Sequence, residues 1–285
     1  IAGKHLEAIM AAPNRRVNIA AIAEPNKENM EKFSALVVKA GMAVPKMFMS
    51  LEEALEADPE GKLFEAVDLM VPSRGQLHEV LAVKALQAGR HVVVEKPIAV
   101  DVASGRRLLA AHETIGKGKV LMVAEQSQYW PEIVEAVELI KSGAIGEVLT
   151  CRAKFWETAS LKLNEWAVGY VPGAWMCTQP DGFVFDGGLH WLRPMRMFMG
   201  EVDKVVATSG RSLSHMQGPS IINALLKFES GKSAIFESVL APQAISDQPF
   251  FTIQGSLGEI VIDGFDGGGE LALFSPKNTM FSQLI

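Results

Sequence analysis

Apolar and polar positions in the first 125 or so residues alternate between two patterns. Short, nearly continuous apolar runs predict buried strands at residues 17–23, 66–71, 91–94 and 119–124. Helical spacing and end signals predict helices at residues 4–12, 26–39, 78–88 and 102–112, with another beginning at a capping box at residue 50. Strand–helix alternation of this kind predicts a parallel sheet covered on both faces.

The pattern changes after Trp130-Pro131. A helix is expected at residues 133–140, followed by a strand of alternating polarity at 149–156. Two hairpins are indicated by paired apolar runs around glycine-containing turns, at residues 221–239 and 250–263. We therefore expect an α/β domain at residues 1–128. A second, α+β domain with a large, mostly antiparallel open sheet should occupy residues 129–285.

Composition narrows the class of protein. Of the 285 residues, 48% are hydrophobic and 21% charged, as in soluble globular proteins, and the net charge of −6 argues against nucleic acid as a partner. No apolar run is long enough to span a membrane. Cys151 and Cys177 are too few for a disulfide framework or a metal cluster, which favours a cytoplasmic protein. The chain starts without Met, so a preceding targeting segment remains open.

Three side chains suggest proton chemistry. Lys96 directly follows the apolar run 91–94 and Glu95, at a position where open α/β sheets bind ligands. Asp186 and His190 are four positions apart, which would place them on one face of a helix. An amine, a carboxylate and an imidazole suffice to move a proton on and off a hydroxyl. Singly, Lys96 could equally be a surface lysine, and His190 a hydrogen-bonded core histidine.

Glu24 ends an early strand, 22 residues after Ala2. In dinucleotide-binding βαβ units, an acidic residue about 20 positions beyond a glycine-rich turn binds the ribose hydroxyls. Such a carboxylate would repel a 2′-phosphate and would therefore favour NAD over NADP. The alternative is a solvated carboxylate at a strand end. The glycine-rich turn itself is not present in this chain.

Longer motifs in the chain are Glu95-Lys96-Pro97 and Asp186-x-Gly188-x-His190, together with the segments at residues 1–5, 77–92 and 142–148 and the glycines at 255 and 258. In these motifs, and most specifically in the first two, the chain resembles the Gfo/Idh/MocA family, the glucose–fructose oxidoreductase and inositol dehydrogenase group. The resemblance implies a Rossmann-like domain, here without its first strand, and an NAD(P)-dependent oxidoreductase acting on a sugar, polyol or related hydroxy or keto compound. It also implies that Lys96 contacts nicotinamide and substrate, that Asp186 holds the substrate and that His190 is the general acid/base.

The same resemblance implies several cofactor contacts. Ala2, at the end of the glycine turn, Glu24, Glu95 and Lys96 would line the dinucleotide site. Pro72 matches a turn near the dinucleotide, although it could simply end a strand. His78 could touch the cofactor or cap a helix. Trp175 falls where the family has a nicotinamide-side Trp, but core packing is the commoner fate of a tryptophan.

Three departures from the family pattern stand out. The loop at residues 73–77 is two residues longer than usual. Gln126 and Gln128 replace a frequent Asn and Arg, and Arg193 replaces a frequent Asp three residues after His190. A cation in place of an anion could recruit an acidic group of the substrate, such as a uronate, or could be a surface change.

Two other functions remain open at this point. The chain could be an NAD-retaining glycoside hydrolase, in which the cofactor is reduced and regenerated, or a non-catalytic nucleotide- or sugar-binding member. In each case we expect a small carbohydrate-like ligand and no nucleic acid or membrane partner. The resemblance also implies a homodimer or homotetramer formed through the outer face of the second domain's sheet.

Overall fold

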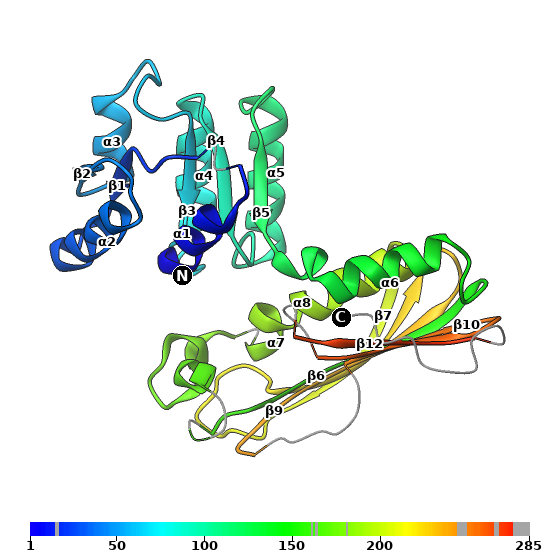
Figure 1. The fold of residues 1–285 in the computed structure, drawn as a ribbon. Helices are drawn as coiled ribbons and strands as arrows, with labels where there is room; N and C mark the ends of the chain where they lie inside the picture. Colours follow the sequence, from blue (N-terminus) through cyan, green and yellow to red (C-terminus); the bar gives the residue numbers. More distant parts are fainter. Residues whose placement is uncertain are drawn as a thin grey trace. The chain divides into compact units, whose positions relative to one another are not determined.

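The computed structural model describes residues 1–14, 17–160, 162, 165–180, 182–243, 250–264 and 268–275. The chain forms two compact units, Ile1–Ala124 and Glu125–Ile285 (Figure 1).

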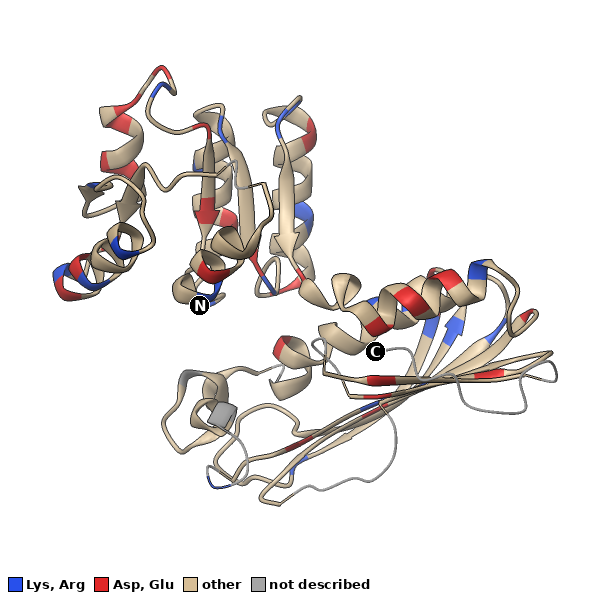
Figure 2. Cartoon of the chain, viewed as in Figure 1, with Lys and Arg blue, Asp and Glu red and all other residues tan. Residues whose placement is uncertain are grey.

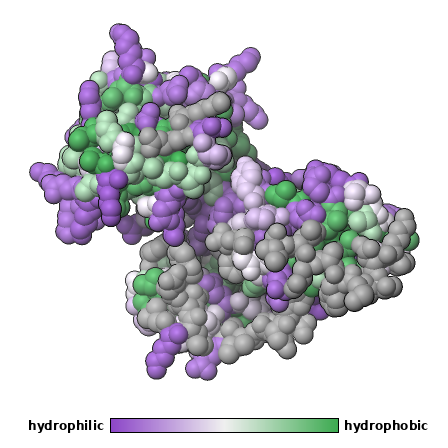
Figure 3. Space-filling view, viewed as in Figure 1, coloured by the Kyte–Doolittle hydropathy of each residue, from purple (hydrophilic) through white to green (hydrophobic). Residues whose placement is uncertain are grey.

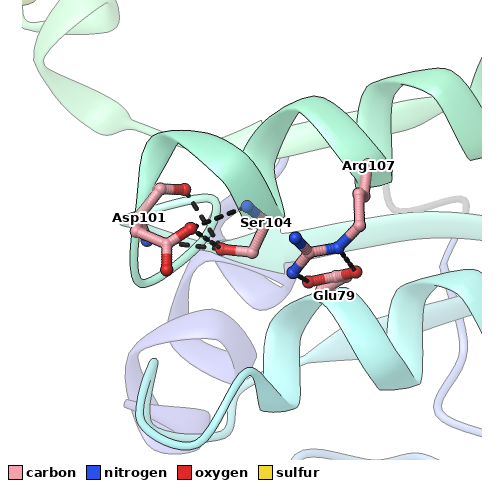
Figure 4. Close-up of polar contacts among 4 residues, drawn as sticks. All are labelled: Glu79, Asp101, Ser104 and Arg107. Atoms are coloured by element: carbon pink, nitrogen blue, oxygen red, sulfur yellow. Dashed lines mark hydrogen bonds and ion pairs between the residues drawn. The ribbon is translucent and has the colours of Figure 1, made fainter.

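The structure describes five helices in the first unit, and a capping side chain is present at the start of three of them. They are α1 (Ala2–Ala11), α2 (Lys27–Lys39), α3 (Leu51–Ala57), α4 (Leu77–Gln87) and α5 (Val102–Thr114). Asn26 caps α2, and Ser50 caps α3 by accepting a hydrogen bond from the backbone N–H of Glu53. Asp101 and Ser104 form a reciprocal capping box at the start of α5 (Figure 4).

The strands of the first unit are all parallel. They are β1 (Ala21–Ala23), β2 (Lys46–Phe48), β3 (Ala66–Leu69), β4 (His91–Glu95) and β5 (Leu121–Ala124). β1 pairs with β2, whereas β3, β4 and β5 form a separate sheet with β4 in the centre. Among the described residues no ladder joins β1 to β3. The strand predicted at 17–23 is confirmed only over its last three residues.

Buried aliphatic side chains hold β3–β5 to the helices. Val92 and Val94 on β4 are fully buried against a cluster that includes Leu86 of α4 and Leu108 of α5. At the surface, α4 and α5 are joined by two 2.6 Å hydrogen bonds from the Arg107 guanidinium to the Glu79 carboxylate (Figure 4). The central strand, after which Lys96 lies, is thus fixed by helices packed against its buried side chains.

A seven-stranded sheet dominates the second unit. Its strands are β6 (Val148–Thr158), β7 (Val202–Gly210), β8 (Ile221–Phe228), β9 (Ser233–Ala241), β10 (Phe251–Gly255), β11 (Glu259–Asp263) and β12 (Glu270–Phe274), in the order β12-β11-β10-β6-β9-β8-β7. Every neighbouring pair is antiparallel except β6 and β9. Both predicted hairpins are confirmed, as β8–β9 and β10–β11.

Short helices and turns occupy one side of this sheet (Figure 1). They are η1 (Gln126–Tyr129), α6 (Pro131–Lys141), η2 (Glu165–Tyr170), η3 (Trp175–Thr178), α7 (Gly182–Gly187) and α8 (Leu189–Met199). Met195 and Phe198 of α8 and Phe236 of β9 belong to one core cluster. The alternation along β8 buries Leu226 and Phe228 in this core and turns Leu225 outward.

Positions of acidic and basic residues are interspersed along the helices of both units (Figure 2). On the face of the first unit seen in Figure 3, apolar residues are surrounded by hydrophilic residues that extend into solvent. Among the described residues, no helix has the length and apolar character that crossing a bilayer requires.

Candidate functional site

Lys96 lies directly beyond the carboxyl end of β4. Leu69 of β3 and Val123 of β5 flank Val94 in the parallel register, so Lys96 follows the middle strand of the three. Its backbone N–H donates a 3.0 Å hydrogen bond to Oε2 of Glu95, and its side chain is half-buried. This is the sheet edge at which parallel α/β folds bind ligands, as the sequence predicted.

Glu95 is held from its other side by a histidine in the first helix. Nε2 of His5 lies 2.8 Å from Oε1 of Glu95, and Nδ1 of His5 lies 2.7 Å from Oδ2 of Asp68. Hydrogen bonds to Asp68 and Glu95 raise the pKa of His5 to about 9. Burial alone would raise the pKa of Glu95, but the bond and charge of His5 and the charge of Lys96 hold that pKa below its usual range. α1 is therefore tied to the ends of β3 and β4.

Glu24 follows β1 directly. Its backbone N–H donates to the carbonyl of Phe48, and its Oε1 accepts a 2.8 Å hydrogen bond from the backbone N–H of Asn26. The carboxylate is thus oriented by the turn into α2 and is half-buried. A carboxylate fixed in this way has an oxygen left to accept hydrogen bonds from a ribose diol.

Both ring nitrogens of His78 lie within hydrogen-bonding distance of backbone carbonyl oxygens. The ring is 1% exposed, with Nδ1 2.8 Å from the carbonyl oxygen of Pro97 and Nε2 2.8 Å from that of Val71. It therefore connects the segment before Pro72 to the segment after Lys96. Contact of His78 with a cofactor stays a prediction, and its occupied nitrogens favour a structural role.

Two other predicted cofactor residues lie at element starts. Ala2 is the first residue of α1, whose first turn closes when the backbone N–H groups of Lys4 and His5 donate to the carbonyl of Ile1. Trp175 begins η3, and its side chain lies outside the described part of the structure.

In the second unit, His190 forms a buried pair with Glu125. Nδ1 of His190 lies 2.7 Å from Oε1 of Glu125, and the two side chains are only 14% and 12% exposed. Trp130 packs against the imidazole with ring centroids 5.9 Å apart. Our sequence reasoning missed Glu125. The signal that marked Lys96, a charged residue directly after a buried strand, also marks Glu125, which follows β5.

Asp186 and His190 belong to two helices separated by one residue. Asp186 is in α7 and His190 in α8, and the backbone N–H of Gly188 bonds to the carbonyl of Val184 across the break. A Cβ on Gly188 would lie 2.6 Å from that carbonyl oxygen, and a Cβ on Gly187 would overlap the Phe155 ring. These glycines let the segment approach β6 closely, which gives a packing reason for glycine in this motif.

Two of the family departures turn out to be partners. Arg193 donates from Nε and Nη2 to Oε1 of Gln128, at 3.2 and 2.9 Å. Arg193 is half-buried and makes no ion pair with a carboxylate in the described part of the chain. A neutral amide therefore orients a guanidinium one helical turn beyond His190.

Within the described residues, no group of three or more His, Cys, Asp or Glu side chains is arranged to bind a metal ion. Lys96, Asp186 and His190 offer an ammonium, a carboxylate and an imidazole for chemistry. A histidine oriented by a carboxylate is suited to accept or donate a proton at its other nitrogen.

Comparison with known proteins identifies the family of this chain. Residues 1–125 match the sequence model of the oxidoreductase family with an NAD-binding Rossmann fold, and residues 133–261 match the GFO/IDH/MocA C-terminal domain. The chain belongs to the GFO/IDH/MocA family. The matched segments contain Lys96 in the first case and Asp186 and His190 in the second.

Individual relatives of this GFO/IDH/MocA protein are distant. It is 28% identical over 228 residues to the Escherichia coli 2,7-anhydro-N-acetylneuraminate hydratase, covering 77% of this chain and 57% of that protein. It is 26% identical over 214 residues to rabbit trans-1,2-dihydrobenzene-1,2-diol dehydrogenase, covering 74% and 58%. The matches thus span little more than half of these relatives. An oxidoreductase structure from Thermotoga maritima superposes with a TM-score of 0.78 at 26% identity, covering 100% and 77%.

Proposed function

We propose that this protein is an NAD(P)-dependent oxidoreductase that transfers hydride between nicotinamide and a sugar, polyol or related hydroxy or keto compound. The observation that carries the proposal is the joint presence of Lys96 after a central parallel strand and of a carboxylate-bound His190, each inside a matched family segment. The diol named in the rabbit relative is a substrate of the same general kind.

The residues of the first unit fit a dinucleotide. Glu24 would accept hydrogen bonds from a ribose diol, the first turn of α1 at Ala2 would face the pyrophosphate, and Lys96 would lie against nicotinamide. NAD is favoured over NADP because the Glu24 carboxylate would repel a 2′-phosphate. When bound, the nicotinamide supplies the hydride acceptor or donor.

Each side chain of the proposed catalytic set has one role. His190 takes the hydroxyl proton of the substrate, while the Lys96 ammonium stabilises the alkoxide that develops as hydride leaves carbon. Asp186 accepts a hydrogen bond from a substrate hydroxyl. The proposal requires Lys96 and His190 to act on the same substrate.

Substitution of Lys96 and His190 tests this function. Lys96→Ala and His190→Ala should each reduce NADH formation at 340 nm on a sugar and polyol panel by at least about 100-fold, the lower range for an acid–base group. Circular dichroism and thermal unfolding should remain near those of the wild type. Near-normal turnover in both variants would remove the assignment.

A reaction without net oxidation is the second candidate. The Escherichia coli relative is named as a hydratase rather than a dehydrogenase. This name supports a reaction in which the cofactor is regenerated in each cycle, as in an NAD-retaining glycoside hydrolase. Product release from glycosides without accumulation of NADH would establish this reaction. Stoichiometric NADH would exclude it.

A second copy of the chain is the macromolecular partner we propose. The register of β7, β8 and β9 places Val206 opposite Leu225 and Leu225 opposite Ile235, and these side chains are 72%, 51% and 42% exposed. Such a row is apolar enough to be covered in a dimer. Light scattering should give a multiple of 30.9 kDa, and Leu225→Lys should shift it to the monomer value.

The free thiols of Cys151 and Cys177 support a cytoplasmic location.

A further inference from the structure

Glu125 makes two hydrogen-bonding contacts through the same oxygen. Its Oε1 accepts a 3.0 Å hydrogen bond from the backbone N–H of Ser127 and lies 2.7 Å from Nδ1 of His190. The first contact caps η1 and fixes the rotamer of the carboxylate. The second contact is therefore made by a side chain that is already oriented by its own backbone.

The charge state of Glu125 determines which atom carries the proton between the pair. Burial alone would raise the pKa of Glu125, but the hydrogen bond and charge of His190, together with the Ser127 N–H, hold that pKa below its usual range. An ionised carboxylate can only accept hydrogen bonds. Nδ1 of His190 must consequently be the donor, and in the neutral ring Nε2 is then the bare, basic nitrogen.

The residues around Glu125 leave its carboxylate available to His190. Oε2 of Glu125 is buried and has no hydrogen-bond partner in the described part of the structure. Arg193, the nearest cation along α8, directs Nε and Nη2 to the neutral oxygen of Gln128 instead. Trp130 packs against the imidazole ring with the two ring planes tilted by 46°. The ring of His190 is thus in contact with both Oε1 of Glu125 and the indole of Trp130.

We propose that Glu125 is a positioning residue that fixes the Nδ1–H tautomer of His190, so that Nε2 exchanges the proton with the substrate. This inference rests on the proposed function for its catalytic meaning. Its structural content, the tautomer, can be measured without a substrate. Replacing the carboxylate that orients the general-base histidine of a catalytic triad lowers kcat by as much as about 10⁴-fold, so a loss of at least about 10-fold is expected here.

Two substitutions separate the geometry from the charge. Glu125→Gln keeps an oxygen that can accept from both Ser127 and His190 but removes the negative charge. Glu125→Leu removes both the acceptor and the charge. Glu138→Gln, on the exposed surface of α6, is a matched control because its carboxylate pairs only with Lys141 among the described residues.

The first experiment is nitrogen-15 NMR of the full chain with labelled histidine, in which His190→Asn identifies the His190 signals. We expect the Nδ1–H tautomer in wild type, Glu125→Gln and Glu138→Gln, and loss of that preference in Glu125→Leu. An Nε2–H tautomer in wild type, or identical spectra in wild type and Glu125→Leu, would overturn the inference.

Other ionisable groups on elements that pack against α8 are unchanged between wild type and Glu125→Gln, so they do not account for a difference in tautomer or in turnover. These groups, apart from fully exposed ones, are Glu132 and Glu135 on α6, Lys154 and Glu157 on β6, Asp186 on α7 and Arg193 on α8 itself.

The second experiment measures kcat and KM separately. With an active substrate, Glu125→Gln should lower kcat by at least about 10-fold, with KM little changed. Unchanged kcat would contradict a positioning role. If wild type forms no NADH on any substrate while NMR shows the expected tautomer, the proposed oxidoreductase function fails but the Glu125–His190 relationship stands.

Discussion

His5 Nε2 lies 2.8 Å from Glu95 Oε1, so the first helix is bonded to the residue that precedes Lys96. The other nitrogen of His5 reaches Asp68, which belongs to β3. One imidazole thus links α1 to two strands of the first unit. Because both partners are carboxylates, the link is strongest when the ring is protonated.

Stability of the first unit should therefore depend on pH through His5. The pKa of His5 is raised to about 9 from 6.5, so its contribution is fully present below pH 6.5 and is lost as pH rises through 9. Linkage sets an upper limit near 3 kcal/mol, and solvent screening of this partly exposed group reduces the expected effect to about 1–2 kcal/mol. Urea unfolding at pH 6 and pH 10 measures it.

His5→Gln should remove most of this pH dependence, whereas Lys4→Gln, an exposed neighbour paired with Glu7, should leave it unchanged. If His5→Gln and wild type lose equal stability between pH 6 and 10, the imidazole does not carry the effect.

Glycine at 188 should be required for packing. A Cβ there would meet the Val184 carbonyl oxygen at 2.6 Å, so Gly188→Ala should destabilise the second unit by about 1–3 kcal/mol. Gly210→Ala is the matched control, since its nearest neighbour would be 3.9 Å away. Thermal unfolding of the two variants decides the point. Equal melting temperatures would show that the helix break can shift at little cost.

Arg193 should favour substrates with a carboxylate. Its guanidinium is oriented by Gln128 and has N–H groups left for an anion. Arg193→Gln should lower kcat/KM for a uronate-type substrate by about 10–100-fold, the value of a charged hydrogen bond, and leave neutral polyols within a few-fold. Arg196→Gln, which loses only an exposed pair with Glu201, is the control. Equal losses on acidic and neutral substrates would assign Arg193 a structural role.

Glu24 should determine the choice of cofactor. Glu24→Gln removes the charge that would repel a 2′-phosphate but keeps an acceptor for the Asn26 N–H. We expect the NADPH-to-NADH affinity ratio to rise by about 10-fold, or 1.4 kcal/mol, by calorimetry. Glu28→Gln, in the exposed first turn of α2, should not change the ratio. A ratio unchanged in Glu24→Gln would place the ribose elsewhere.

Local patterns in the sequence were sufficient for much of the fold. The apolar run ending at Glu95 predicted β4 and placed Lys96 at its carboxyl end, and the turn at Ser230-Gly231 predicted the β8–β9 hairpin. The strand β4 and the β8–β9 hairpin are each formed by residues that are close together in the sequence. The parallel pairing of β6 with β9 joins segments separated by 83 residues at Thr150 and Ser233, and no local pattern specifies it.

The polar contacts of the site were less predictable for the same reason. His5 and Glu95 are 90 residues apart, and Glu125 and His190 are 65 apart. A charged residue at a strand end is visible in the sequence, but its partner depends on how the segments pack. In the sequence, Arg193 and Gln128 were two separate departures from the family pattern. In the structure, Arg193 donates a hydrogen bond to Gln128.

Transfer of deuterium to nicotinamide tests the central claim most directly. The protein is incubated with NAD⁺ and polyols or sugars deuterated at the reacting carbon, and the reduced cofactor is analysed by mass spectrometry. We predict one deuterium in NADH for wild type and at least about 100-fold less labelled NADH for His190→Ala, with NAD⁺ binding retained. Binding of NAD⁺ without label transfer on the whole panel, or equal transfer by wild type and His190→Ala, would contradict the account.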